Sequence, residues 1–142
     1  ALGSMNRVYE ILVKWVSNRI VAGKTLKEHS IIAGHLGEIM TMIEMVKSDT
    51  YCKARMLDRP DLYGPGHSKS MLAKSRATKL FSTDALTQIC NTAVDLMGSY
   101  GYALEFDIEK VWRDSKIMSL WMGGRSLCRL DTARYYFDCE EI

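Results

Sequence analysis

The sequence predicts an all-α protein, an up-and-down bundle of the four-helix type, in a single domain that spans residues 1–142. Three observations lead to this fold class. Three long segments repeat apolar residues every three or four positions, the period of an amphipathic helix. Only two prolines and ten glycines interrupt the chain. No segment alternates polar and apolar residues in the manner of a half-buried strand. We therefore expect three long helices and two shorter C-terminal ones, without a β-sheet.

The first long helix is expected to end near Gly23, because glycine commonly stops a helix. Its apolar stripe consists of Val8, Ile11, Leu12, Trp15 and Val16. Thr25 and Glu28 then have the spacing of a capping box, in which two side chains satisfy backbone N–H groups at a helix start. The second long helix follows from there. Its apolar stripe consists of Ile32, Leu36, Ile39, Met40, Ile43 and Val46.

Residues 58–68 hold both prolines and two glycines, and they are the clearest loop in the sequence. The third long helix follows this loop. Its apolar stripe consists of Leu72, Leu80, Ala85, Ile89, Ala93, Val94 and Met97. The glycines of residues 98–101 are expected to end it.

Two further breaks define the shorter C-terminal helices. Asp107 is of a residue type that caps helix starts, and it is expected to cap a fourth helix that runs to Leu120. The glycine pair at residues 123–124 interrupts the chain again, and the last helix is expected over residues 126–137. The neighbouring Arg113 and Asp114 are expected to form a structural ion pair.

Composition excludes several classes of function. The net charge of +2 and the pI near 8.4 are too weak to indicate a nucleic-acid partner. The sequence has no run of about 20 apolar residues, so no membrane span is expected. The four cysteines, Cys52, Cys90, Cys128 and Cys139, lack the Cys-x-x-Cys spacing of a zinc site, so no metal site is expected. They are interpreted as reduced thiols of a cytoplasmic protein.

Residues 100–134 resemble the C-terminal signature of the acyl-CoA dehydrogenase family. The matching features, in order, are a glycine-rich turn ending in Gly-Tyr, a Glu-Lys pair, an Arg-Asp-Ser-Lys-Ile segment, a short turn and a last helix ending in Ala-Arg. Residues 19–24, followed by Glu28 and His29, are similar to a second family block, and Leu72 to Lys74 to a third. The resemblance implies that residues 1–142 are the C-terminal helical-bundle domain of a longer flavoenzyme, and that its other domains lie outside this chain.

The resemblance also implies a reaction. In the family, a carboxylate base removes the α-proton of an acyl-CoA thioester while FAD accepts a β-hydride. Many members place this base as the Glu of a Glu-Gly-Thr turn before the last helix, whereas this sequence has Met122, Gly123 and Gly124 there. Methionine has no titratable group, so no catalytic residue is expected within this chain. Other members carry the base about two turns upstream of where this chain begins, and the isolated chain is therefore expected to be inactive.

By the same resemblance, several positions are expected to contact the cofactor or the substrate. The FAD-binding positions are Arg19, His29, Gly98, Gly101, Gly124 and Ser126. The substrate-binding positions are Tyr102, Met122 and Gly123. Arg19 matches an arginine that reaches the FAD of a neighbouring subunit, and guanidinium suits phosphate. His29 begins the second helix, where free N–H groups favour an anion. Gly98 and Gly101 match the turn beside the adenosine part of FAD.

The implied partners are an acyl-CoA substrate, an electron-transferring flavoprotein and further copies of the chain in a homo-oligomer. Two other readings stay open at this point. One is a flavoprotein of the same fold with other chemistry, such as an oxidase or a monooxygenase. The other is a non-catalytic assembly domain whose flavin site has decayed, which Asp95, Met122 and Gly124 would favour because they replace the family's usual residues.

Overall fold

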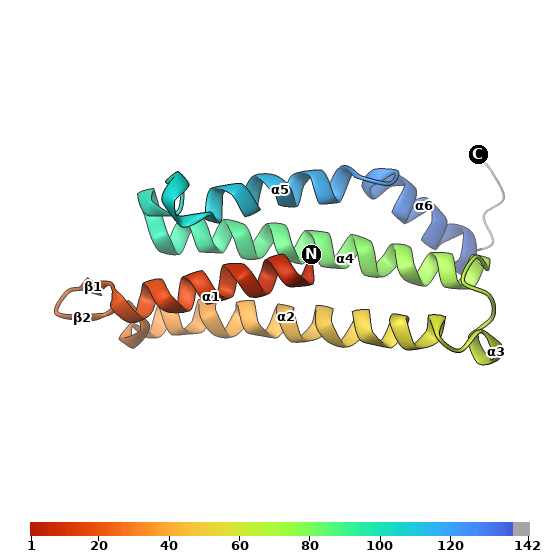
Figure 1. Ribbon diagram of the computed structural model, residues 1–142, viewed down its shortest axis with the longest axis horizontal. Helices are drawn as coiled ribbons and strands as arrows, with labels where there is room; N and C mark the ends of the chain where they lie inside the picture. Colours follow the sequence, from red (N-terminus) through yellow and green to blue (C-terminus); the bar gives the residue numbers. More distant parts are fainter. Residues whose placement is uncertain (138–142) are drawn as a thin grey trace.

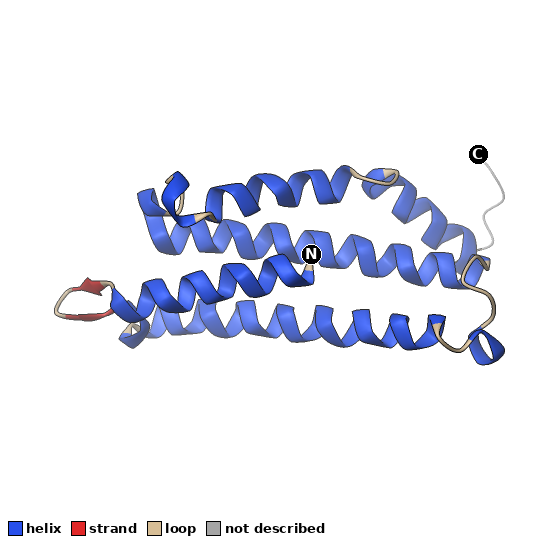
Figure 2. Cartoon of the chain, viewed as in Figure 1, coloured by secondary structure: helices blue, strands red, loops and turns tan. Residues whose placement is uncertain are grey.

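The computed structural model describes residues 1–137 and confirms an all-α bundle (Figures 1 and 2). Its α-helices are α1 (Leu2–Asn18), α2 (Ser30–Leu57), α3 (Pro60–Tyr63), α4 (Lys69–Met97), α5 (Ile108–Leu120) and α6 (Gly124–Tyr136). Short 3-10 turns lie between them, namely η1 (Leu26–Glu28), η2 (Gly98–Tyr100) and η3 (Leu104–Phe106). Cys139, one of the four predicted thiols, lies outside the described residues.

The long helices run up and down, as predicted (Figure 1). α1 runs to one end of the bundle, α2 returns along it, and α4 runs back beside both. α5 and α6 together take the place of the fourth helix of the bundle, with a bend at the turn between them. α4 packs against α1, α2, α5 and α6, so it is the central helix of the domain. It therefore links α1 and α2 to α5 and α6.

The prediction of a helix that runs to Gly23, with no β-sheet, is wrong. α1 ends at Asn18, and β1 (Ile20–Val21) pairs antiparallel with β2 (Lys24–Thr25). Between the strands, Ala22 and Gly23 have φ values of +50° and +80°, as in a two-residue hairpin turn. The β-branched residues on either side favour extended backbone over another helical turn. The result is a small hairpin that projects from one end of the bundle (Figure 2).

A short helix also forms inside the predicted loop of residues 58–68. α3 begins with Pro60 at its first turn and has Asp61 beside it. The fixed φ of proline suits a first helical position, and an acidic side chain there interacts favourably with the helix dipole. The loop prediction therefore missed one helical turn but placed the break between α2 and α4 correctly.

Two polar contacts near α5 differ from prediction. Asp107 does stand at the N-cap of α5, but its side chain makes no capping bond. Its φ of +61° is left-handed, whereas side-chain capping uses extended backbone. The carboxylate lies 3.6 Å from Arg7 instead. Arg113 pairs with Glu109 at 3.3 Å and not with Asp114, because residues four apart share a helix face and adjacent residues do not.

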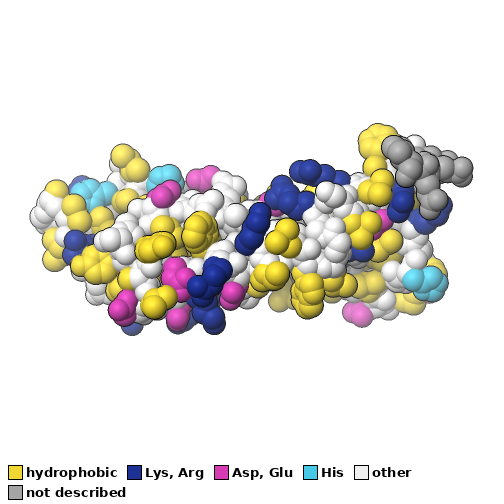
Figure 3. All heavy atoms as spheres, turned by 90° about the horizontal axis from the view of Figure 1, so that it is seen from above, with side chains coloured by type: hydrophobic (Ala, Val, Ile, Leu, Met, Phe, Trp, Pro, Cys, Tyr) yellow, Lys and Arg dark blue, Asp and Glu magenta, His cyan; other side chains and the backbone are white. Residues whose placement is uncertain are grey.

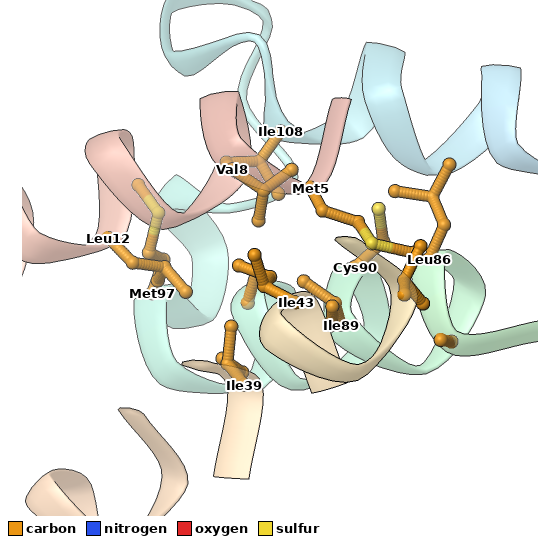
Figure 4. Packing of buried hydrophobic residues seen from close by; sticks show 13 residues of the cluster. Met5, Val8, Leu12, Ile39, Ile43, Leu86, Ile89, Cys90, Met97 and Ile108 are labelled. Carbon is orange, nitrogen blue, oxygen red and sulfur yellow. The ribbon is translucent and has the colours of Figure 1, made fainter. Parts of the chain in front are cut away.

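The core forms where α1, α2, α4 and α5 meet (Figure 4). Its buried members are Met5, Val8, Leu12, Ile39, Ile43, Val46, Ala85, Leu86, Ile89, Cys90, Ala93, Met97 and Ile108. Burying one large aliphatic side chain stabilises a fold by about 1.5–3 kcal/mol. This cluster is therefore the main stabilising feature of the bundle, and it fixes α4 between α1 and α5.

The α5–α6 face, seen from above in Figure 3, mixes several groups of hydrophobic side chains with Lys and Arg side chains near its middle. The large apolar residues at the end of α5 and in the following turn are strongly exposed. Ile117 is 60% exposed, Trp121 70% and Met122 66%. Within residues 1–137, no helix is long and apolar enough to cross a membrane. Nor do three His, Cys, Asp or Glu side chains in that range come close enough to hold a metal ion.

Candidate functional site

The turn between α5 and α6 has an unusual backbone. Met122, Gly123 and Gly124 have φ values of +54°, +93° and +63°, all in the left-handed region that glycine tolerates best. A Cβ atom on Gly123 would lie 2.2 Å from Cδ2 of Leu127, so a side chain there would collide with Leu127. Met122 is the one residue of the three with a side chain, and it is 66% exposed, next to the equally prominent Trp121. The turn therefore projects two large apolar side chains from a tightly constrained backbone.

Charged side chains of α4 and α6 form hydrogen bonds that hold this turn against α4. Lys79 Nζ donates to the carbonyl oxygen of Trp121. Arg76 Nη1 donates to the carbonyl oxygen of Met122 at 2.8 Å, and its Nε donates to Asp131 Oδ2 at 3.0 Å. The Arg76 and Asp131 side chains are only 19% and 8% exposed. We call Arg76, Lys79 and Asp131 the turn clamp. Its charged hydrogen bonds are of the stronger kind.

Two further ion pairs support the turn clamp. Arg125 Nη2, in the first turn of α6, donates to Asp84 Oδ2 of α4 at 2.8 Å. Arg134 Nη1 lies 3.4 Å from Asp131 Oδ1. With the turn clamp included, four basic and two acidic side chains gather between α4 and α6. The surroundings of the turn are therefore net positive.

Arg19 lies at the other end of the α1–α4–α5 core, on a platform of aromatic rings. The rings of Trp15, Tyr100 and Phe106 lie with centroids 4.9–5.8 Å apart. The Arg19 guanidinium carbon lies 5.9 Å from the Trp15 ring and 5.7 Å from the Tyr100 ring. No carboxylate among residues 1–137 pairs with Arg19. The aromatic platform thus orients the guanidinium by cation–π contacts and leaves its N–H edge available to an anion.

His29 faces the hairpin beside this platform. It is the N-cap of α2, and its Nε2 lies 3.1 Å from the carbonyl oxygen of Val21. A ring nitrogen next to a carbonyl carries the hydrogen, so Nδ1 of the neutral ring can only accept. His29 would donate to an anion through Nδ1 only when protonated. The predicted capping box before it is present, with Thr25 N donating to Glu28 Oε2 at 2.8 Å. Hydrogen bonds from Thr25 lower the pKa of Glu28.

The glycine-rich turn after α4 lies close to that helix. Gly98 has a φ of +60°. A Cβ atom on Gly101 would lie 2.8 Å from the Cα atom of Val94, so a side chain there would collide with the backbone of α4. This close approach places Tyr100 in the aromatic platform, and it leaves Tyr102 73% exposed.

Comparison with known families agrees with this geometry. Residues 1–136 match the profile of the acyl-CoA dehydrogenase C-terminal domain. This chain belongs to the acyl-CoA dehydrogenase family.

Individual relatives match most of this acyl-CoA dehydrogenase domain. Cyclohexane-1-carbonyl-CoA dehydrogenase from Geobacter metallireducens is 31% identical over 134 residues, which cover 94% of this chain and 33% of the relative. The CarC subunit of the caffeyl-CoA reductase-Etf complex from Acetobacterium woodii is 23% identical, with 87% and 30% covered. Butyryl-CoA dehydrogenase from Megasphaera elsdenii has the same fold, with a TM-score of 0.83 at 21% identity over 96% of this chain and 33% of that one. The chain therefore spans about a third of the length of the relatives it matches.

The predicted site residues of this acyl-CoA dehydrogenase domain fall into two separate groups. The hairpin-end group contains Arg19, His29, Gly98, Gly101 and Tyr102. The turn group contains Met122, Gly123, Gly124 and Ser126. α5, with 13 residues, lies between them, and a helix of that length is about 20 Å long. The structure therefore does not bring Gly124 and Ser126 together with Arg19, and Tyr102 and Met122 lie beyond opposite ends of α5. Figure 1 shows the two turns at the ends of this helix.

A groove that the sequence analysis missed lies between the two groups of this family domain. It has a volume of about 860 Å³ and extends from Tyr102, along α4 and α5, to Leu120. Trp112 lies in it, and the Trp112 Nε1 donates to Asn91 Oδ1 at 2.7 Å. The sequence holds one signal for this surface. Serine stands at two of the three buried positions of α5, Ser115 and Ser119, while Trp112 and Leu120 are exposed, which departs from an ordinary amphipathic helix.

Proposed function

We propose that residues 1–142 form the C-terminal helical-bundle domain of a longer FAD-dependent acyl-CoA dehydrogenase, which introduces an α,β double bond into an acyl-CoA thioester. Family membership supports this, as does the length of the relatives, of which the chain covers about a third. The observation on which the proposal rests is the α5–α6 turn. Its constrained backbone projects Met122 at the position where many family members carry the catalytic Glu.

In this proposal, the residues of this chain at the turn bind the substrate and shape the space around its thioester. Met122 has no titratable group, so it cannot remove the α-proton. In this proposal the base is a carboxylate of the longer protein, on the helix that precedes residue 1. Trp121 and Met122 provide an apolar wall that would exclude water from the reacting thioester. Gly123 lets the backbone pass close to the Leu127 side chain of α6.

The hairpin-end group has features that suit FAD. Arg19 is oriented by the aromatic platform and has no carboxylate partner among residues 1–137. Its N–H groups can therefore donate hydrogen bonds to a phosphate. When bound, FAD supplies the flavin that accepts the β-hydride. Arg19 and Ser126 belong to groups separated by about 20 Å of helix, so in this proposal they serve two copies of the cofactor. This is in line with a homo-oligomer in which Arg19 reaches the FAD of a neighbouring subunit.

The electron acceptor in this proposal is an electron-transferring flavoprotein, and the location is the cytoplasm. One relative is named as a subunit of a caffeyl-CoA reductase-Etf complex, which supports such a partner. The exposed groove along α5 and the exposed Trp121 leave ample surface for contacts outside this domain.

A second candidate function is favoured by the same turn. Because Met122 replaces the usual carboxylate and Gly124 the usual threonine, the longer protein could be an oxidase or a monooxygenase, or a non-catalytic assembly protein. An oxidase or a monooxygenase differs from the dehydrogenase in passing the electrons of the reduced flavin to O2, and an assembly protein differs in what an acyl-CoA does to the flavin. A dehydrogenase is reduced by a saturated acyl-CoA without oxygen, whereas an assembly protein is not.

The test is anaerobic reduction of the flavin in the full-length protein by a series of saturated acyl-CoAs, followed as bleaching of flavin absorbance. The flavin of Met122→Ala is still expected to bleach, with an altered preference for acyl length. The substitution removes an apolar side chain beside the acyl group and leaves the catalytic base unchanged. Leu62→Ala is the control, since Leu62 is an apolar side chain of similar exposure, 63%, on α3. Loss of bleaching in Met122→Ala, with FAD retained, would argue against this role.

The position of the base can be tested in the same assay. Replacing the upstream carboxylate with Gln is expected to slow bleaching at least about 100-fold, the lower range for general base catalysis. In that background, Met122→Glu is expected to restore part of the rate. If the parent protein bleaches with none of the acyl-CoAs, the dehydrogenase proposal fails and the second candidate replaces it.

A further inference from the structure

The α5–α6 turn depends on few contacts of its own. Its local backbone hydrogen bonds are long, at 3.3 Å from Gly124 N to the Trp121 oxygen and 3.4 Å from Leu127 N to the Gly123 oxygen. Gly123, the N-cap of α6, offers no side chain to cap that helix. Met122 has a left-handed φ of +54°, which is unfavourable for a residue with a side chain and persists only where surrounding contacts maintain it.

The turn clamp provides those contacts. The carbonyl oxygens of Trp121 and Met122 both accept hydrogen bonds from basic side chains of α4. With both carbonyl groups directed at α4, the side chains of the two residues are left on the outer side, where they are 70% and 66% exposed. The orientation of the apolar wall therefore follows from the anchoring of two main-chain oxygen atoms.

Arg76 is the central member of the turn clamp because it contacts two elements at once. Its Nη1 holds the turn and its Nε holds Asp131 of α6. The planar guanidinium group can serve two acceptors in fixed directions, which a lysine ammonium group does not reproduce. Asp131 is 8% exposed and fixes the orientation of Arg76. The pair joins residues 55 positions apart in the chain.

We propose that Arg76, oriented by Asp131, is a positioning residue that sets where Met122 meets the acyl part of the substrate, and so determines which acyl groups fit. Arg76 acts through the main chain of the turn and does not contact the reacting atoms. The inference rests on the proposed function only for the identity of the substrate. The anchoring of the turn by Arg76 can be measured without any substrate.

The first measurement is amide hydrogen exchange of residues 119–127 in the full-length protein. The test variant is Arg76→Met with Asp131→Asn, because removing both charges avoids leaving a buried, unpaired carboxylate. Exchange in this segment is expected to be at least about tenfold faster, since faster local opening is what loss of anchoring produces. The matched control is Arg59→Met with Asp61→Asn, which removes a surface pair with bonds of 2.7–2.9 Å at the α2–α3 junction. Unchanged exchange at residues 119–127 would overturn the proposal.

The second measurement is steady-state kinetics on acyl-CoAs of different chain length. The test variant is expected to raise the KM for the preferred acyl-CoA about tenfold with kcat within about twofold, because a contact with the acyl group that is equal in the ground state and the transition state changes KM and not kcat. FAD absorbance and helix content should match the parent. Arg76→Lys, which keeps the charge but loses one of the two acceptors, should have a KM between those of the parent and the test variant. A KM equal to that of the control overturns the proposal, as does a parallel loss of kcat, FAD and helicity. A parent without acyl-CoA turnover contradicts the proposed function alone, and hydrogen exchange then still decides the role of Arg76.

Discussion

At the scale of single residues, burial decides the chemistry of the thiols. Cys90 lies in the core, and burial raises the pKa of its thiol to about 12, whereas Cys52 is exposed on α2. Only the thiolate is nucleophilic. Iodoacetamide at pH 8 is therefore expected to alkylate Cys52 in the native protein and to leave Cys90 unmodified, as read by peptide mass spectrometry. Both should react once guanidinium unfolds the chain. Equal native alkylation of the two would contradict the packing described for Cys90.

Of the roles predicted from residues close in sequence, one is confirmed, whereas the side-chain cap of Asp107 and the ion pair of Arg113 with Asp114 were wrong. The capping box of Thr25 and Glu28 is confirmed because its residues are three positions apart. The contact of Arg76 with Asp131 joins positions 55 apart, and no local pattern encodes it. Sequence reasoning therefore identified Met122 as the distinctive residue of the turn, but it could not identify the side chains that hold Met122 in place.

At the scale of elements, long amphipathic helices were predictable and short irregular elements were not. α2 and α4 run for 28 and 29 residues, so their apolar stripes repeat many times. The strands β1 and β2 have two residues each, which is too short to show any period. The hairpin depends instead on left-handed backbone at Ala22 and Gly23. The groove along α5 was missed because it depends on packing against α4.

Close packing between elements leads to a prediction for Gly101. Its added Cβ atom would lie 2.8 Å from the backbone of Val94, so Gly101→Ala is expected to destabilise the bundle by about 1–3 kcal/mol, the usual range for overpacking. Gly34, inside α2, has nothing within 4 Å of such an atom. Gly34→Ala should stabilise by about 0.5–1 kcal/mol, because alanine suits helix interiors better than glycine does. Urea unfolding followed by circular dichroism measures both changes. A Gly101→Ala variant as stable as the parent would show that the turn can move away from α4.

At the scale of the whole molecule, α1 covers only part of the bundle. It has 17 residues against 28 in α2, and α2 and α4 continue past its first residue (Figure 1). A depression between α2 and α4 holds Met45 and Phe81, which are 60% and 52% exposed. Apolar surface of this kind usually marks a contact with another protein surface.

We therefore expect the 142-residue chain to self-associate at about tens of micromolar, where mass action favours even weak dimers. Light scattering should give a mass above the 16.1 kDa of the monomer. Replacing Met45 and Phe81 with Asp should shift the mass downward. The control is Leu62→Asp on α3, a position with 63% exposure outside the depression. A parent that is purely monomeric would refute the expectation, and an equal effect of Leu62→Asp would refute the choice of surface.

The anchoring of the α5–α6 turn through main-chain oxygens has a consequence for how such a domain can evolve. Lys79 and Arg76 hold the carbonyl groups of Trp121 and Met122, not their side chains. The residue type at position 122 can therefore change without loosening the scaffold, provided that the new side chain tolerates the same left-handed backbone as methionine. A lineage with this architecture can exchange a carboxylate for an apolar group at this turn, or reverse the exchange, without rebuilding the bundle around it.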